Sequence, residues 1–144
     1  MMRKFTLVPL LLFSICFHSY GQDTKGIERA ALDYIEGFYE GDTSKIIRSI
    51  HPKLSKYGYS IDKKTKAYKG HPMSYEKAVD FAREVLTHPE WAAPKDAVQK
   101  IEILDAQDQI ANVKLTVYWG IDYLLMAKED GKWMITKVLW QSLD

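Results

Sequence analysis

The clearest pattern in the sequence is an alternation of apolar and polar residues before a short turn motif. Five apolar side chains alternate with polar ones at Ala111, Val113, Leu115, Val117 and Trp119. A period of two places successive side chains on opposite faces of a strand, so this segment is predicted to be a strand with one buried face. Apolar runs flank Asp130-Gly131, a dipeptide typical of two-residue hairpin turns. Residues 109–140 are therefore expected to form an antiparallel β-meander.

The turn also predicts which side chains share a face of the hairpin. If Glu129 lies opposite Lys132, an uninterrupted register places Asp122 and Lys137 on the same face as Trp133. Side chains at such diagonal positions can reach each other across two strands. The sequence therefore predicts a carboxylate and an ammonium paired within an otherwise apolar row.

Three helices are predicted before the meander. Residues 24–40 and 75–87 carry apolar side chains at helical spacing. Asp42 can cap a short second helix that ends before Pro52, and Ser74 can cap the third helix. The order of helices and strands predicts an α+β domain with helices on one face of a curled antiparallel sheet.

The segment between the second and third helices, residues 53–70, is rich in lysine. Tyr57, Tyr59 and Ile61 alternate within it, and lysines commonly protect an exposed sheet edge, so an edge hairpin is predicted. Basic residues interleaved with tyrosines also occur in sites for single-stranded nucleic acid. The chain as a whole has 20 Lys and Arg against 19 Asp and Glu, so no nucleic-acid partner is expected.

The N-terminus has the pattern of a secretory signal peptide. Arg3 and Lys4 precede an uncharged run over residues 5–17, and Ser19-Tyr-Gly21 suits cleavage after Gly21. A spanning helix needs about 20 apolar residues, so no membrane insertion is expected. We expect residues 1–21 to be removed and residues 22–144 to form one exported domain, periplasmic or extracellular. Cys16 would leave with the signal peptide, which excludes disulfides and thiol chemistry.

This order of elements, together with several short motifs, resembles the NTF2-like (cystatin-like, SnoaL-like) fold group. More narrowly, it resembles the exported bacterial family called putative lumazine-binding, over residues 25–141. The matching motifs are Tyr34 with Gly37, Gly41-Asp42, His51-Pro52, Asp122-Tyr-Leu, Asp130-Gly-Lys-Trp-Met-Ile, Lys137 and Trp140. The resemblance implies a cone-shaped sheet wrapped around the first helix, an apolar cavity inside the cone, and homodimerisation through the sheet.

The residues expected to bind a ligand are the predicted ion pair and the aromatic side chains near the implied cavity. They are Asp122, Lys137, Trp91, Tyr34, Phe38, Tyr59 and Trp133. Trp91 lies in a proline-flanked loop, where an aromatic side chain can stack on a flat ligand. For each of these residues a purely structural role is the alternative, because buried ion pairs and core aromatics are common without any ligand.

Two functions fit these observations. The first is a non-catalytic binding or accessory domain for a small apolar or aromatic ligand, without a cofactor. The alternative is a proton-transfer enzyme of the isomerase or cyclase type, with Asp122 as base, His51 assisting, and Tyr34 or Tyr59 stabilising an oxyanion. No metal site is expected, because the three His-Pro histidines lack the spacing of helical metal ligands. No glycine-rich phosphate loop or Gly-x-Ser-x-Gly motif is present.

Overall fold

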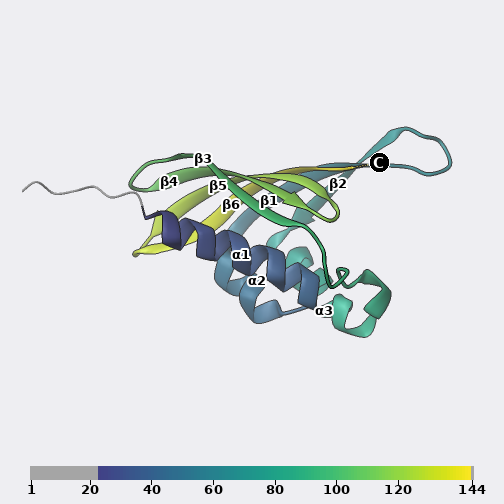
Figure 1. Cartoon of the computed structure of the whole chain (residues 1–144), viewed down its shortest axis with the longest axis horizontal. Coiled ribbons are helices and arrows are strands. Elements are labelled where there is room, and N and C mark those ends of the chain that lie inside the picture. Colours follow the sequence, from purple (N-terminus) through teal and green to yellow (C-terminus); the bar gives the residue numbers. More distant parts are fainter. Residues whose placement is uncertain (1–22, 144) are drawn as a thin grey trace, which may run out of the picture.

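Three helices pack on one face of a curled six-stranded sheet in the computed structural model, which describes residues 23–143 (Figure 1). The elements are α1 (Thr24–Glu40), α2 (Thr43–Ser49), β1 (Ile50–Ile61), β2 (Tyr68–Ser74), α3 (Tyr75–Thr87), the 3₁₀ turn η1 (Pro89–Trp91), β3 (Gln99–Ala106), β4 (Ile110–Val117), β5 (Gly120–Glu129) and β6 (Lys132–Ser142). The strand order is β2-β1-β6-β5-β4-β3, and only the β1 and β6 pair is parallel. The predicted α+β class is confirmed. The predicted signal peptide, residues 1–21, lies outside the described residues.

Side-chain caps fix where the helices begin. The carboxylate of Asp23 accepts a hydrogen bond from the Gly26 amide at the start of α1. Asp42 caps α2 in the same way, and Ser74 caps α3. The three predicted helices are confirmed. The second is shorter than predicted, because Ile50 and the residues after it already belong to β1.

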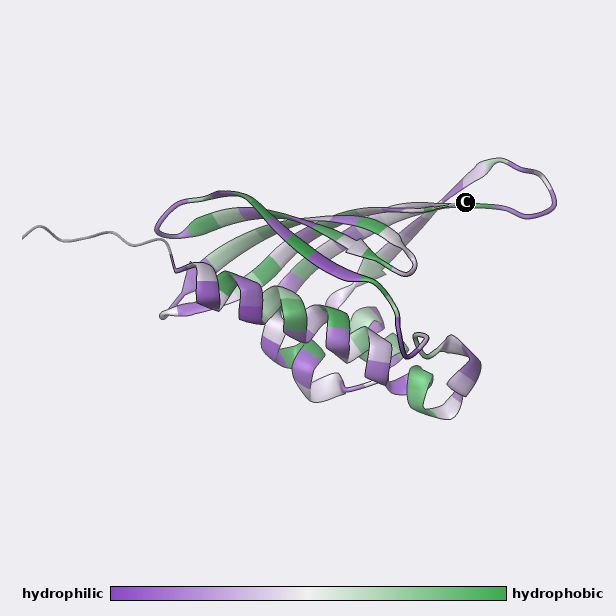
Figure 2. Cartoon of the chain, viewed as in Figure 1, coloured by the Kyte–Doolittle hydropathy of each residue, from purple (hydrophilic) through white to green (hydrophobic). Residues whose placement is uncertain are grey.

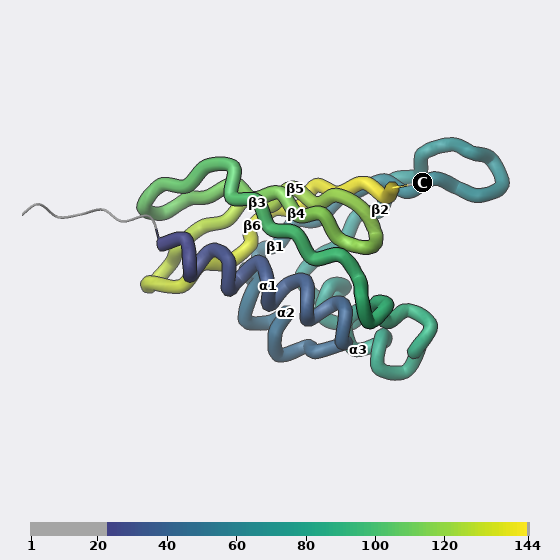
Figure 3. Tube along the Cα trace, viewed as in Figure 1, coloured from purple at the N-terminus to yellow at the C-terminus, as the bar shows by residue number. Residues whose placement is uncertain are grey.

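Helix α1 supplies the centre of the core. Its fully buried residues include Ile27, Tyr34 and Ile35, which pack with inward-facing sheet residues in a single apolar cluster. Figure 2 shows apolar and polar bands alternating along α1, and Figure 3 shows α1 lying along the sheet with α2 and α3 beside it. A Cβ at Gly37 would lie 2.6 Å from the Ile46 side chain, so this glycine permits the close approach of α1 and α2. No helix within residues 23–143 is long and apolar enough to cross a membrane.

The lysine-rich hairpin forms, but Tyr59, which was expected near the cavity, lies on the outer face of the sheet. Of the two strands of this hairpin, only β2 lies at an edge of the sheet, because β1 lies between β2 and β6. Tyr57 and Tyr59 are each 41% exposed, on the outer face. Leu54 and Lys56 point to the helices and are buried. Because strand residues alternate between faces, Lys56 lies on the face opposite Tyr57 and Tyr59.

The Asp130-Gly131 turn is confirmed. Both residues have positive φ, 50° and 77°, as a type I′ turn requires. The predicted register holds from the turn as far as Met126 opposite Ile135. There the register shifts by one residue, so that Lys137 pairs with Leu125 instead of Leu124.

This shift is a β-bulge, and it reverses the faces of the following residues. Val138 is buried and Trp140 turns inward beside it, whereas Lys137 is exposed. The hydroxyl of Thr136, at the bulge, donates a hydrogen bond to the Leu125 carbonyl. The prediction that Lys137 shares a buried face with Asp122 is therefore wrong.

We predict that Gly131→Val lowers the free energy of unfolding by about 1–3 kcal/mol, because a β-branched residue is strained at positive φ. A Cβ at this position would meet no atom within 4 Å, so the loss would come from the backbone rather than from a clash. Thermal or urea unfolding measures it. The matched control is Gly131→Asn, which tolerates this conformation and should lose much less. Equal stability of the valine variant and the parent would contradict the turn assignment.

Candidate functional site

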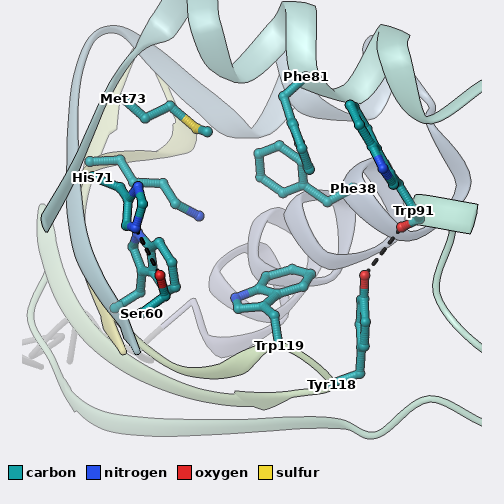
Figure 4. A pocket seen from close by; sticks show the side chains of 10 residues that line it. Phe38, Ser60, His71, Met73, Phe81, Trp91, Tyr118 and Trp119 are labelled. Atoms are coloured by element: carbon teal, nitrogen blue, oxygen red, sulfur yellow. Dashed lines mark hydrogen bonds between the residues drawn. The ribbon is translucent and has the colours of Figure 1, made fainter. Parts of the chain in front are cut away.

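A cavity of about 310 Å³ lies between the helices and the β1, β2 end of the sheet (Figure 4). Its lining is mostly aromatic and comes from helices, strands and loops far apart in the sequence. The lining residues are Phe38, Lys56, Ser60, His71, Met73, Phe81, Trp91, Tyr118, Trp119 and Trp140. The volume is at the lower end of the range for small-molecule pockets. A flat molecule of one or two rings suits such a space.

A buried polar cluster forms the floor of this cavity. Asp122 is fully buried and accepts hydrogen bonds from the Tyr34 hydroxyl at 2.8 Å and the Trp119 indole N–H at 2.7 Å. The Lys56 ammonium donates to the Tyr34 oxygen at 2.5 Å and lies 3.5 Å from the Asp122 carboxylate. Each charged group therefore has partners, as burial in an apolar core requires.

The Lys56 ammonium is also surrounded by aromatic rings. Its Nζ lies 5.0–5.7 Å from the ring centroids of Tyr34, Phe38, Trp119 and Trp140. Ring faces attract a cation and partly replace the water that it has lost. Since Lys56 lines the cavity whereas Asp122 lies beneath it, the ammonium is the charged group that a ligand would meet.

Burial shifts the ionisation of this cluster. It raises the pKa of the Tyr34 phenol well above its ordinary value, and the negative charge of Asp122 raises it further. Tyr34 therefore remains a protonated donor at neutral pH. Burial lowers the pKa of the Lys56 ammonium, and the charge of Asp122 opposes that shift.

A stack of aromatic side chains closes one side of the cavity. Trp91 is nearly parallel to Phe81 at 5.9 Å and to His88 at 4.2 Å between ring centroids. The Tyr118 hydroxyl donates to the Trp91 carbonyl and holds the loop, as Figure 4 shows. Trp91 is 38% exposed, so one part of the ring contacts solvent while the stack borders the cavity.

A second polar pair lies on the opposite wall. Ser60 Oγ and His71 Nε2 are 2.8 Å apart across strands β1 and β2 (Figure 4). His71 stacks on Trp140 with centroids 6.0 Å apart. Together with Lys56, this pair supplies the polar contacts of an otherwise apolar lining.

The structure brings together some of the residues selected from the sequence. Phe38 and Trp91 line the cavity, and Tyr34 and Asp122 form its floor. Their role in ligand binding stays a prediction.

Four other selected residues lie away from the cavity. Lys137 and Tyr59 are exposed on the outer face of the sheet, which corrects their expected placement. Trp133 is buried beside Asp23, about 23 Å along β6 from Trp140 at 3.3 Å per residue. The side chain of His51 contacts Glu129 near the β5 and β6 turn and does not line the cavity.

Lys56 is the main residue that the sequence interpretation missed. Its signal was the alternation Leu54, Lys56, Gly58, which is the inner row of β1. Six lysines in the same segment made a solvent-exposed position the simpler interpretation. Within residues 23–143, no group of three or more His, Cys, Asp or Glu side chains is placed to hold a metal ion.

The chain matches a known protein family over most of its length. The family model described as putative lumazine-binding matches residues 22–141. The chain belongs to this family. Membership indicates a small-molecule ligand as partner. A comparison with curated proteins gave no match.

Solved structures share the fold. An NTF2-like protein of unknown function from Silicibacter pomeroyi superposes with a TM-score of 0.67 at 17% identity, covering 83% of this chain and 95% of that one. A ketosteroid isomerase-like protein from Erwinia carotovora atroseptica has a TM-score of 0.57 at 15% identity, covering 83% and 95%. A putative scytalone dehydratase from Novosphingobium aromaticivorans has a TM-score of 0.57 at 13% identity, covering 84% of each chain. The predicted NTF2-like fold is confirmed.

We predict that Asp122→Ala lowers the free energy of unfolding by about 3–5 kcal/mol, because it leaves the Lys56 charge buried without its counter-ion. The cost is limited to about 5 kcal/mol at pH 7, because above that energy the Lys56 ammonium would lose its proton and the buried charge would disappear. The double variant Lys56→Met with Asp122→Asn should recover much of the loss.

Urea unfolding of Lys56→Met, Asp122→Asn and the double variant measures the coupling of the two residues. Lys137→Met is the matched control, since this exposed lysine should change stability by less than about 0.5 kcal/mol. Additive effects of the two changes at Lys56 and Asp122 would contradict the pairing.

Proposed function

We propose that this protein binds a small, flat, largely apolar molecule in the aromatic cavity, with a polar acceptor group of the ligand on Lys56. The observation that carries the proposal is a buried ammonium on the floor of a 310 Å³ cavity with aromatic walls. Pockets with apolar walls and a few oriented polar groups are typical of small-molecule sites.

The charges of the site favour a neutral ligand with an acceptor edge. Lys56 and Asp122 compensate each other, so the floor has no net charge to attract a free carboxylate. An ammonium has three N–H donors; one donates to Tyr34, and the ammonium lies 3.5 Å from the Asp122 carboxylate as an ion pair. A remaining N–H can donate to a carbonyl oxygen or an aromatic ring nitrogen of the ligand.

The walls favour a planar ring system. Phe38 lies between Trp119 and Phe81, with ring centroids 6.0 and 5.9 Å away, and Trp91 stacks on Phe81, as Figure 4 shows. A planar ring placed against such surfaces gains burial and stacking at little entropic cost. Lumazine, after which the family is named, is planar and carries carbonyl groups, so it is a suitable first probe.

A proton-transfer enzyme of the isomerase or cyclase type is the second candidate. The buried hydrogen bond between Tyr34 and Asp122 favours it, and structural neighbours include a ketosteroid isomerase-like protein and a putative scytalone dehydratase. Asp122 is an unsuitable direct base, because its carboxylate accepts from Tyr34 and Trp119 and lies beneath the cavity. We therefore prefer a non-catalytic binding or accessory role.

The proposal also includes export and a homodimer formed through the sheet. Tyr57, Leu139 and Tyr123 are exposed neighbours on the outer face of β1, β6 and β5, and such an apolar row suits a dimer contact. Mature protein from the periplasm or medium should begin at Gln22 by N-terminal sequencing, and light scattering should give twice the mass of one chain. An intact Met1 or a monomeric mass would contradict these two points.

We predict that Trp91→Ala weakens lumazine binding roughly fivefold, because an aromatic contact contributes about 1 kcal/mol beyond its buried area. Quenching of tryptophan fluorescence and calorimetry measure it, beside mass spectrometry of molecules that co-purify with the parent. Tyr59→Ala is the matched control, because Tyr59 is similarly exposed but lies on the other face of the sheet.

Both variants should unfold close to the parent temperature, since neither side chain is buried. Equal binding by the two variants would contradict the site. Absence of any bound or co-purifying small molecule would contradict the function itself.

A further inference from the structure

Lys56 differs from the other described lysines in its surroundings. It is the one buried lysine within residues 23–143, at 7% exposure. Its Nζ borders the cavity and is encircled by four aromatic rings. A primary amine that has lost its water and faces a ligand cavity is chemically different from a solvated lysine, because the neutral, nucleophilic amine becomes more accessible.

The neighbours of Lys56 can take up and return its proton. The Tyr34 hydroxyl accepts a hydrogen bond from Lys56 and donates one to Asp122, so it connects the two groups. Transfer of one proton from Lys56 to Asp122 leaves a neutral amine and a neutral acid with no change in net charge. Burial lowers the pKa of Lys56, so its ammonium gives up a proton more readily than a solvated lysine does.

We propose that Lys56 forms a reversible imine with an aromatic aldehyde or ketone held in the cavity. This inference rests on the proposed ligand site and specifies the chemistry of its ligand as a carbonyl compound. Aldehydes should be preferred to ketones, because the rings within 5.7 Å of Nζ restrict the space around the reacting carbon.

The reaction is balanced without a cofactor. The Lys56 nitrogen attacks the carbonyl carbon, a C–N bond forms, and the π electrons move to oxygen. One proton moves from nitrogen to that oxygen and gives a carbinolamine. The C–O bond then breaks with a proton returned by Asp122 through Tyr34, and water leaves. Nothing is oxidised or reduced, and addition of water reverses each step.

The test is reductive trapping on the full chain with naphthaldehyde and sodium cyanoborohydride at pH 7. Intact mass should increase by one naphthylmethyl group, and peptide mapping should place it on Lys56. Trapping should be faster than at exposed Lys137, because the cavity holds the aldehyde beside Nζ and the lowered pKa of Lys56 raises its fraction of neutral amine. Labelling spread evenly over the lysines would overturn the proposal.

Two variants serve as controls. Lys56→Arg retains the positive charge but has no primary amine, so trapping at this position should disappear. Lys137→Arg should leave the labelling unchanged. Peptide mapping of the parent answers the question even if Lys56→Arg does not fold, because it locates the adduct without any substitution.

A non-carbonyl probe separates this proposal from the proposed function. Naphthalenemethanol has the same rings but cannot form an imine, and its binding is followed by quenching of tryptophan fluorescence. If the alcohol binds and the aldehyde is not trapped on Lys56, the imine is wrong and the binding function stands. If neither compound binds or reacts, both proposals fail. Binding of the alcohol together with selective trapping of the aldehyde supports both.

Discussion

The buried carboxylate of Asp122 is the group on which the arrangement of the site depends. An unpartnered charge inside the core would be strongly unfavourable, and three donors from different parts of the chain prevent this. Tyr34 reaches it from α1, Lys56 is contributed by β1, and Trp119 comes from the turn before β5. Because Tyr34 and Trp119 must lie within hydrogen-bond distance and Lys56 close enough for an ion pair at 3.5 Å, the carboxylate fixes how the central helix sits in the sheet. Apolar packing alone tolerates small shifts, whereas hydrogen bonds of 2.7 and 2.8 Å do not.

The cavity exists because the helix does not fill the whole curve of the sheet. At the β5 and β6 turn, Trp133 packs close to the start of α1, and this end of the core is closed. At the other end the bulge at Thr136 turns Trp140 inward, and Gly58 on β1 leaves room for its indole, which any Cβ there would overlap. The indole thus becomes a wall of the cavity beside Lys56. A one-residue irregularity in β6 and one glycine in β1 together determine the shape of the site.

The same irregularity limits what the sequence could predict. Helical spacing, caps and the Asp130-Gly131 turn are local signals, and each predicted element is present. Asp122 was correctly expected on a buried face, because the regular alternation of β5 includes it. Its partner was not found, since a bulge inverts every later position on β6 and moved Lys137 outward. This bulge lies within the β5 and β6 hairpin, and Thr136 carries no local sequence signal for it.

Lys56 shows a different limit of sequence interpretation. The lysine-rich composition of the segment indicated a solvent-exposed position for Lys56. Its side chain belongs to the row that faces the helices only because β1 lies between two other strands. That position arises from a parallel pairing of β1 with β6, between segments about eighty residues apart in the chain. Non-local pairings of this kind are weakly encoded in local patterns.

A buried lysine also links stability and binding in one group. Replacing the pair of Lys56 and Asp122 by apolar residues of similar size would be expected to leave the fold stable, since buried ion pairs are often no better than apolar packing. The fold alone therefore does not require an ammonium at this position. What the ammonium provides is a donor and a nitrogen facing an otherwise aromatic cavity, held in place by Tyr34 and Asp122. A fixed polar group that stability does not require, placed in a cavity of ligand size, is the physical basis for assigning this cavity a role in recognition.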